Sequence, residues 1–274
     1  MAKRSKFFVP GSNAGVLTQG KLYGGGTTCP KVTYLRNKRI GAAPDFRAKC
    51  TFALGYAAEE VLVEYLKSLG KPVEDSLDAR RGEPLEITDD TSFLWERDIV
   101  FKNGQFIELK SVSSLNTYKK VFAEGVPKYD NVLQAATYLL LSDTDKCNLT
   151  YLNFLYASFE KKKVKYKAAA GQMKHFKLQF NENGFLTVDN KVVPVSKEGI
   201  LNYLEYVAAV LETEDWDHLK PESINGLCLA DPKAVSPCMY CDFKTACEVS
   251  TSFSEFEENV LNLPGVTKAP PKGK

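Results

Sequence analysis

Apolar residues recur at helical spacing in three stretches of the chain and at strand spacing in several others. Residues 50–69, 129–142 and 197–211 each show the three-to-four-residue repeat of a helix with one buried face. Strand-like runs, rich in aromatic and β-branched residues, occupy 93–101, 106–112, 149–159, 164–170 and 174–188. This order predicts an α/β fold in which a central mixed β-sheet is flanked by helices.

Two Asn-Gly pairs mark turns between strand-like residues. Asn103-Gly104 separates 93–101 from 106–112, and Asn183-Gly184 lies within 174–188. Asn-Gly between apolar runs is the strongest short-range signal for a β-hairpin. On the helix at 50–69, Phe52, Tyr56, Leu62 and Leu66 are expected to form the buried stripe.

The composition is that of an ordinary globular protein. Of 274 residues, 44% are hydrophobic and 26% are charged, which suffices for a sizeable core. No run of 18 apolar residues occurs, so no membrane-spanning helix is expected. The apolar run Phe7-Phe8-Val9 ends at Pro10 and is too short for the core of a signal peptide, so we expect a cytoplasmic protein. The Pro- and Lys-rich end, residues 263–274, is expected to be a disordered tail.

The formal net charge is only +2, so binding of nucleic acid would require a local basic patch. Lysines at alternate positions from 161 to 167 are one candidate. As a single strand, this segment would present a row of lysines that could follow a phosphate backbone. The same row could instead protect an edge strand from aggregation.

The cysteines suggest a metal centre. The chain has seven cysteines, and an odd number in a chain expected to lack a signal peptide argues against a disulfide framework. Three of them form the run Cys238-x2-Cys241-x5-Cys247. Thiols at this spacing in a reducing compartment usually hold a metal ion or a cluster.

A second candidate site lies around the hairpin at Asn103-Gly104. Glu108 and Lys110 are two residues apart, so they project from the same face of a strand. A three-residue loop with Gly104 in the left-handed conformation would make a bulged turn, pair Phe101 with Gln105, and place Asp98 opposite Glu108. Two opposed carboxylates destabilise a sheet unless a cation lies between them, and a divalent metal would supply it.

Other interpretations of these residues stay open on the pattern alone. A two-residue loop would pair Asp98 with Leu109 and put the carboxylates on opposite faces. Glu108 and Lys110 alone could form a plain salt bridge on a half-exposed sheet.

Two predicted helices add residues of interest. Glu59 lies on the apolar stripe of 50–69, where a buried carboxylate needs a partner: a structural arginine or a metal. On 129–142, Gln134 and Tyr138 are neighbours at i and i+4 on the polar stripe, which could also be an ordinary solvated surface.

The ordered set Gly55-x3-Glu59, Asp98, Glu108-Leu109-Lys110 and Gln134-x3-Tyr138 resembles the PD-(D/E)XK nuclease superfamily, in its RecB-like branch. Cys29-Pro30-x3-Tyr34, together with the C-terminal cysteine run, is similar to the iron–sulfur subgroup of that branch. This subgroup includes the CRISPR-associated RecB-type exonucleases and the nuclease domains of AddB-type helicase-nucleases. The resemblance covers residues 29–247. It implies one nuclease domain over 1–262, with a restriction-endonuclease-like core at about 50–170 and a C-terminal cysteine-ligated cluster.

The resemblance also implies roles for single residues. Asp98 and Glu108 would bind Mg or Mn together with the Leu109 carbonyl, and Lys110 would assist the attacking water. The subgroup commonly has His at the position of Glu59, but Glu also ligates hard cations, so Glu59 remains an expected ligand.

Gln134 and Tyr138 would contact the DNA end or orient the site. Cys29, Cys238, Cys241 and Cys247 would hold a [4Fe–4S] cluster that joins segments more than 200 residues apart. On spacing alone, Zn is the alternative metal. Cys50 competes with Cys29 as the N-terminal ligand.

The implied function is metal-dependent hydrolysis of DNA phosphodiesters, as an exonuclease on single-stranded ends. DNA is the expected partner, and a protein partner in recombination, repair or CRISPR adaptation is compatible with it, in a bacterial, archaeal or phage-infected cell. The alternative from another class is a catalytically silent iron–sulfur or zinc scaffold that binds DNA or protein. The presence of Asp98, Glu108 and Lys110 together favours the enzyme.

Overall fold

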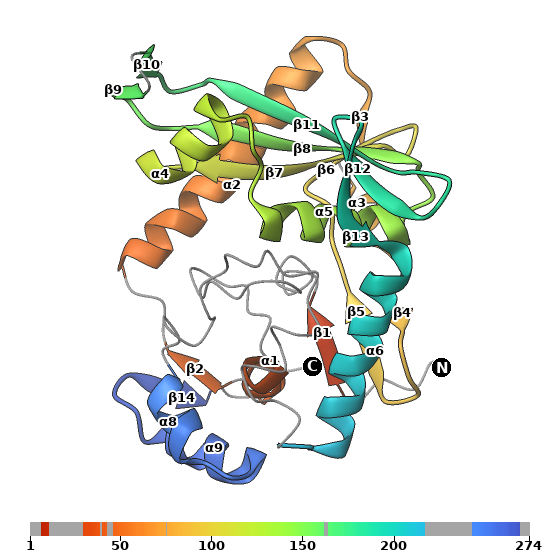
Figure 1. Cartoon of the computed structure of the whole chain (residues 1–274), viewed down its shortest axis with the longest axis vertical. Coiled ribbons are helices and arrows are strands. Elements are labelled where there is room, and N and C mark those ends of the chain that lie inside the picture. The colour runs from red at the N-terminus through yellow and green to blue at the C-terminus, as the bar shows by residue number, and fades with distance from the viewer. Residues whose placement is uncertain are drawn as a thin grey trace. The chain divides into compact units, whose positions relative to one another are not determined.

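The structure is a computed structural model that describes residues 7–10, 30–38, 40–42, 46–74, 76–161, 164–216 and 243–268. Its elements are labelled in Figure 1. Contacts gather them into two compact units. Unit 1 comprises the described parts of 1–49, 83–95 and 198–274, and unit 2 comprises the described parts of 50–82 and 96–197.

Unit 2 is built on a seven-stranded sheet in the order β13-β12-β11-β8-β7-β6-β3. β7 and β8 are parallel and the other neighbours are antiparallel, so the prediction of a mixed central sheet is confirmed. The strands are β3 (Val73–Glu74), β6 (Ile99–Phe101), β7 (Phe106–Val112), β8 (Lys146–Asn153), β11 (Met173–Phe180), β12 (Phe185–Val188) and β13 (Lys191–Ser196). Three of them, β6, β7 and β12, lie within predicted strand runs, while β8 overlaps the run at 149–159 and β11 overlaps the run at 174–188.

Helices cover both faces of this sheet. They are α2 (Phe46–Ser68, in unit 2 from residue 50), α3 (Leu77–Arg80), α4 (Leu115–Tyr118), the π-helix η2 (Lys119–Ala123) and α5 (Tyr129–Leu141). Ala58 and Leu62 of α2 pack on Ile107 and Leu109 of β7. The α5 helix contacts Tyr151 and Cys147 of β8, because Asn131 donates to the Tyr151 hydroxyl and Cys147 lies against the Ala135 carbonyl. These two residues pair with β7 residues that alternate with Ile107 and Leu109. Side chains alternate along a strand, so α2 and α5 lie on opposite faces of the sheet.

The α2 helix differs from its prediction in extent and in orientation. It begins at Phe46 instead of residue 50. Tyr56, expected in the buried stripe, is 73% exposed, and Phe52 is also exposed, whereas Ala58 and Leu62 are buried. The small Ala58 allows close approach to the sheet, so the aromatic residues are left on the outer side of the helix.

The strand-like run at 93–101 is divided between the two units. Its first part belongs to β5 (Thr91–Leu94) and its second to β6, with Trp95 to Asp98 between them. The backbone N–H of Arg97 donates to the Arg80 carbonyl, and the Trp95 indole donates to the Glu83 carbonyl. Because of these bonds, the two parts of the run do not form one continuous strand. The apolar run in the sequence is unbroken, so it does not predict this break.

Unit 1 contains a three-stranded sheet in the order β1-β5-β4 and the pair β14-β2. Aromatic side chains form part of its core, with the Tyr34 and Phe253 ring centroids 4.5 Å apart and the Trp216 and Phe256 centroids 5.4 Å apart. The other elements in its described part are β1 (Phe7–Pro10), α1 (Pro30–Asn37), β2 (Ile40–Ala42), β4 (Leu85–Glu86), α6 (Lys197–Thr213, in unit 1 from residue 198), α8 (Lys244–Val249), α9 (Phe253–Leu261) and β14 (Val266–Lys268).

Two predicted segments differ from expectation. The lysine row at 161–167 is not one strand, because β9 (Ala157–Lys161) and β10 (Val164–Ala168) pair as an antiparallel hairpin. β14 lies inside 263–274, and its pairing with β2 makes that part of the predicted disordered tail regular structure. Residues 269–274 lie outside the described part of the chain. No described helix is both long enough and apolar enough to cross a membrane.

Candidate active site

The turn after β6 determines which residues face each other across the hairpin. Gly104 has φ +81°, and its N–H donates to the Phe101 carbonyl over 2.8 Å. The Phe101 N–H donates to the Gln105 carbonyl, and Ile99 pairs with Ile107. The predicted bulged turn is therefore confirmed. Continuing this register by one residue places Asp98 opposite Glu108.

Asp98 contacts β7 directly. Its Oδ2 accepts a hydrogen bond of 2.7 Å from the Leu109 backbone N–H. Burial raises the pKa of Asp98, while Lys110, this hydrogen bond and Arg80 act in the opposite direction. The carboxylate is thus fixed at the start of β6 by the backbone of the strand that contains Glu108.

Glu108 is the most buried carboxylate of the site, with 0% of its surface exposed. Its Oε1 lies 2.6 Å from Lys110 Nζ. Burial and the nearby charge of Asp98 raise the pKa of Glu108 to about 8, and Glu108 and Asp98 in turn raise the pKa of Lys110. Oε2 of Glu108 is buried without a hydrogen-bond partner among the described residues. Burial of a carboxylate oxygen without a hydrogen bond is costly.

Glu59 on α2 is engaged by Arg80 of α3. Arg80 Nη2 lies 3.1 Å from Glu59 Oε2 and 3.4 Å from Glu96 Oε1, and Arg80 Nε donates to the Arg97 carbonyl. Burial and the charge of Asp98 raise the pKa of Glu59, and Arg80 lowers it. The structural alternative for Glu59, an ion pair with an arginine, is therefore present. It leaves the role of Glu59 as a metal ligand a prediction.

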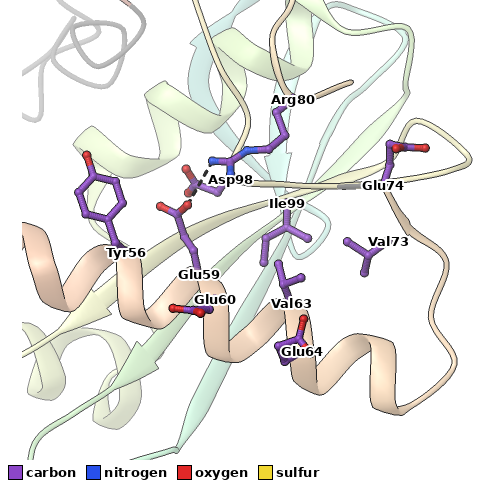
Figure 2. A pocket seen from close by; sticks show the side chains of 10 residues that line it. All are labelled: Tyr56, Glu59, Glu60, Val63, Glu64, Val73, Glu74, Arg80, Asp98 and Ile99. Atoms are coloured by element: carbon purple, nitrogen blue, oxygen red, sulfur yellow. Dashed lines mark hydrogen bonds and ion pairs between the residues drawn. The ribbon is translucent and has the colours of Figure 1, made fainter. Parts of the chain in front are cut away.

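A pocket of about 300 Å³ opens beside these groups, as Figure 2 shows. Asp98 lies behind the Glu59–Arg80 ion pair, and Tyr56 projects from α2 on the same side as Glu59. The pocket wall is rich in carboxylates, and it is lined by Tyr56, Glu59, Glu60, Val63, Glu64, Val73, Glu74, Arg80, Asp98 and Ile99. Glu108 and Lys110 are not among the residues that line it.

The helix α5 places Gln134 and Tyr138 near the same carboxylates. The Gln134 amide donates to the Tyr138 hydroxyl over 3.1 Å. Tyr138 is only 2% exposed, and its pKa is raised well above the usual value, first by burial and then by the charge of Glu108. The alternative of a solvated polar stripe is therefore wrong for Tyr138. The catalytic roles of both residues remain predictions.

The donor set suits a hard cation, although the carboxylates are not gathered into a finished metal site. In the described ranges, no three His, Cys, Asp or Glu side chains are arranged so that they could hold a metal ion. The physical reason is that Arg80 holds Glu59 and the Leu109 N–H holds Asp98. Yet, among the described residues, the main opposite charges that act on the three carboxylates Glu59, Asp98 and Glu108 are two cations, Arg80 and Lys110. The excess negative charge and the unpartnered Glu108 oxygen both fit a divalent ion bound there.

The cysteine region lies in unit 1, where the structure describes Cys247 but not Cys29, Cys238 or Cys241. Cys247 is a free thiol on α8, and its Sγ lies 3.6 Å from Lys31 Nζ. Lys31 is only 5% exposed, and its ammonium also lies 3.2 Å from the centroid of the Trp216 ring. A residue two positions after Cys29 thus contacts Cys247, although the cluster itself remains a prediction.

Tyr34, part of the predicted N-terminal cysteine motif, is buried in the same region. Its hydroxyl donates to Glu257 Oε2 over 3.4 Å, and burial and Glu257 raise its pKa to about 12. The competing thiol Cys50 is exposed, and Cys147 is a buried free thiol.

Sequence reasoning did not identify Arg80 or Lys31. Arg80 lies in a charged segment that resembles a loop, and the only local signal is Ser76, whose hydroxyl accepts from the Ala79 N–H and caps α3. That cap could have indicated a short helix but not its partner. Lys31 follows the Cys-Pro pair in the chain, and only the fold reveals that it is buried.

Comparison with known proteins gives no assignment. No protein-family model matches the chain, and no match was found among curated proteins. An alkaline exonuclease from Laribacter hongkongensis is similar with a TM-score of 0.43 and 11% identity, over 75% of this chain and 90% of that chain. SSO0001 is similar with a TM-score of 0.45 and 14% identity, over 91% of this chain and 89% of that chain. Fold does not imply function, so the function of the chain must be argued from its own site.

Proposed function

We propose that the chain is a metal-dependent DNA nuclease of the PD-(D/E)XK type, with its active site at Asp98, Glu108 and Lys110. The observation that supports this most is the state of Glu108. It is fully buried, its pKa is raised to about 8, and one of its oxygens has no partner in the described part of the chain. A buried carboxylate whose pKa is shifted by burial and by a specific charged neighbour is a candidate for a functional site, and a bound cation would compensate its unpartnered oxygen.

Oxygen donors of the chain itself could hold Mg or Mn. Asp98 and Glu108 would provide carboxylates. The Leu109 carbonyl is a suitable third donor, because an extended residue directs its N–H and C=O toward the same strand edge, and the Leu109 N–H meets Asp98 there. Glu59 would be a fourth donor if it left Arg80. Hard oxygen donors of this kind select Mg or Mn over softer metals.

A bound divalent ion would polarise the phosphoryl group and lower the pKa of water in the site. Lys110 holds Glu108 Oε1 and is itself cationic, so it can orient an attacking water and stabilise charge that develops on a phosphate. The Gln134–Tyr138 pair would fix a donor beside Glu108, where it could position the DNA end.

The cysteines would form a second, structural centre. Cys29, Cys238, Cys241 and Cys247 would hold a [4Fe–4S] cluster, with Zn as the alternative metal. The buried Lys31 supports an anionic centre, because a buried ammonium is stabilised by negative charge and Cys247 is negative only as a thiolate, the form that binds metal. This centre would join the chain ends and take no part in hydrolysis.

The expected substrate is a single-stranded DNA end. The Glu108→Gln and Asp98→Asn variants should abolish cleavage of end-labelled DNA in Mg or Mn while the circular dichroism spectrum is retained. Glu182 is an exposed carboxylate in the turn after β11, so Glu182→Gln is the matched control and should cut at the wild-type rate. A circular single strand should resist the enzyme if it needs an end.

Binding of Mn should be measured alongside cleavage by isothermal titration calorimetry. Glu108→Gln should lose most of the Mn affinity, whereas Glu182→Gln should keep it. If both carboxylate variants cut DNA like the wild type, the site assignment is wrong. If the wild type binds Mn but cuts no DNA, the chain is the silent scaffold.

A further inference from the structure

Tyr56 is an exposed aromatic residue at a place where exposure needs an explanation. Its side chain is 73% exposed on α2, and Phe52, one helical turn earlier, is 39% exposed. Residues at i and i+4 lie on one face of a helix, so the two rings are neighbours there. Exposed aromatics scattered singly are ordinary. Tyr56, however, lines the pocket that contains Asp98.

The direction of the ring supports a role in that pocket. Figure 2 shows the Tyr56 ring on the side of α2 that also presents Glu59 toward Arg80 and Asp98. Tyr65, on the same helix and 49% exposed, does not line the pocket. The helix therefore holds one exposed aromatic residue beside the candidate active site and another away from it.

The charge around Tyr56 selects which part of a nucleic acid could approach it. Glu59, Glu60 and Glu64 come from the same helix and line the same pocket. Carboxylates repel phosphates, so a DNA backbone would not follow this wall. A base has no charge, and aromatic side chains stack on any base.

We propose that Tyr56 is a stacking platform for an unpaired base of single-stranded DNA at the mouth of the active site. The backbone of that strand would then lie away from the acidic wall, toward Lys110. A base inside a duplex is already stacked on both sides, so this contact is available only to an unpaired strand. The inference rests on the proposed nuclease function and specifies the form of its substrate.

The test measures binding of a fluorescent oligothymidylate by anisotropy in EDTA, where metal-dependent cleavage cannot occur. Tyr56→Ala should weaken binding by about 5- to 150-fold, because stacking on one aromatic ring is worth about 1–3 kcal/mol per base. Tyr56→Phe and Tyr56→Trp should bind like the wild type, and in Tyr56→Trp the added indole should be quenched by the oligonucleotide. Tyr65→Ala is the matched control and should bind like the wild type.

Two further substrates separate stacking from a structural effect. A series of oligonucleotides should each lack one base, at successive positions. One of them should bind the wild type as weakly as the intact strand binds Tyr56→Ala. The wild type and Tyr56→Ala should bind this oligonucleotide with equal affinity. A blunt duplex should bind the wild type and Tyr56→Ala equally. Undiminished binding of the single strand by Tyr56→Ala would overturn the proposal, as would an equal loss in Tyr65→Ala or on the duplex.

Failure of the stacking proposal and failure of the proposed nuclease function give different results. Loss of stacking in Tyr56→Ala together with a wild type that cuts no DNA in Mg or Mn would refute the nuclease and retain the platform. Cleavage by the wild type with unchanged binding by Tyr56→Ala would refute the platform and retain the nuclease.

Discussion

Among the described residues, each unit buries a charged side chain, and the two charges have opposite signs. In unit 2, Glu108 is fully buried with one unpartnered oxygen, and the carboxylates around it outnumber the cations. In unit 1, Lys31 is buried against the Trp216 ring and the Cys247 thiol. Buried charge is costly unless it is compensated. The first site therefore fits a cation, and the second fits an anionic centre.

The difference indicates what each bound group would do. The site of unit 2 is positioned by one sheet and its covering helices, so it can persist without its metal, and the metal would serve chemistry. The site of unit 1 brings together residues 216 positions apart, so loss of its bound group should disturb the fold. One centre is expected to be catalytic and the other structural.

Removal of a cluster ligand should give the largest effect. Cys247→Ala or Cys238→Ala should bleach the broad absorption near ~400 nm that a thiolate-bound iron–sulfur cluster gives. Since the cluster would join distant segments, the melting temperature should fall by more than ~10 °C. Absorbance, metal analysis and calorimetry on anaerobically purified protein measure this.

Cys50→Ala is the control for this comparison. Its thiol is exposed, and the variant should keep both the colour and the melting temperature, whereas Cys29→Ala should lose them. A colourless wild type with stoichiometric Zn would establish the alternative metal. A Cys238→Ala protein with unchanged melting and cleavage would contradict a structural centre.

Removal of Lys110 should have the next largest effect. Lys110→Met leaves Glu108 buried without its cation, and breaking such a buried pair costs about 3–5 kcal/mol. The variant should therefore be less stable in urea at pH 9, where Glu108 is ionised, and it should not cut DNA. Lys110→Arg should recover most of the stability. Equal stability of Lys110→Met and the wild type would show that Glu108 is not charged in the folded state.

The sequence predicted the hairpin site well because its geometry depends on local signals. Asn103-Gly104 and the apolar runs around it determine a bulged turn, and this turn sets the pairing of Ile99 with Ile107, which directs Asp98 toward Glu108 when the register is continued by one residue. The extent of β7 followed from the same pattern. A strand register that is set by a short turn does not depend on contacts between residues that are distant in the chain.

Features that depend on distant contacts were not predictable in this way. The Arg97 N–H donates to a carbonyl 17 positions earlier, so the run at 93–101 breaks where the pattern shows no break. Packing of Ala58 against the sheet turns Tyr56 outward, although aromatic residues normally indicate a buried face. The partner of Glu59, one arginine among several, also became clear only from the fold.

A smaller effect concerns the pH dependence of stability. The pKa of Glu108 is raised from 4.5 to about 8, so the folded protein binds a proton that the unfolded chain has already lost between these values. Stability of the metal-free wild type should therefore fall as pH rises from about 4.5 to 8 and then level off. Glu108→Gln lacks this loss, so the difference between its free energy of unfolding and that of the wild type should grow in its favour as pH rises, on top of a pH-independent cost of breaking the pair with Lys110. Urea unfolding in EDTA at pH 5, 7 and 9 tests this, and a difference that does not grow with pH would contradict the raised pKa.

The smallest expected effect concerns Mn affinity and the ion pair between Arg80 and Glu59 in unit 2. Arg80 lies 3.1 Å from Glu59, whereas its neighbour Arg81 contacts Glu96 and is 61% exposed at its side chain. Arg80→Gln should release Glu59 and tighten Mn binding several-fold, by about 1 kcal/mol, and Arg81→Gln should leave Mn binding unchanged.

Removal of any nearby cation could favour Mn binding through long-range charge alone, so the double variant Glu59→Gln/Arg80→Gln decides between the two causes. If Glu59 becomes a ligand, the double variant loses the gain. If it keeps the gain, Glu59 is a structural partner of Arg80 and the metal depends on Asp98, Glu108 and Leu109.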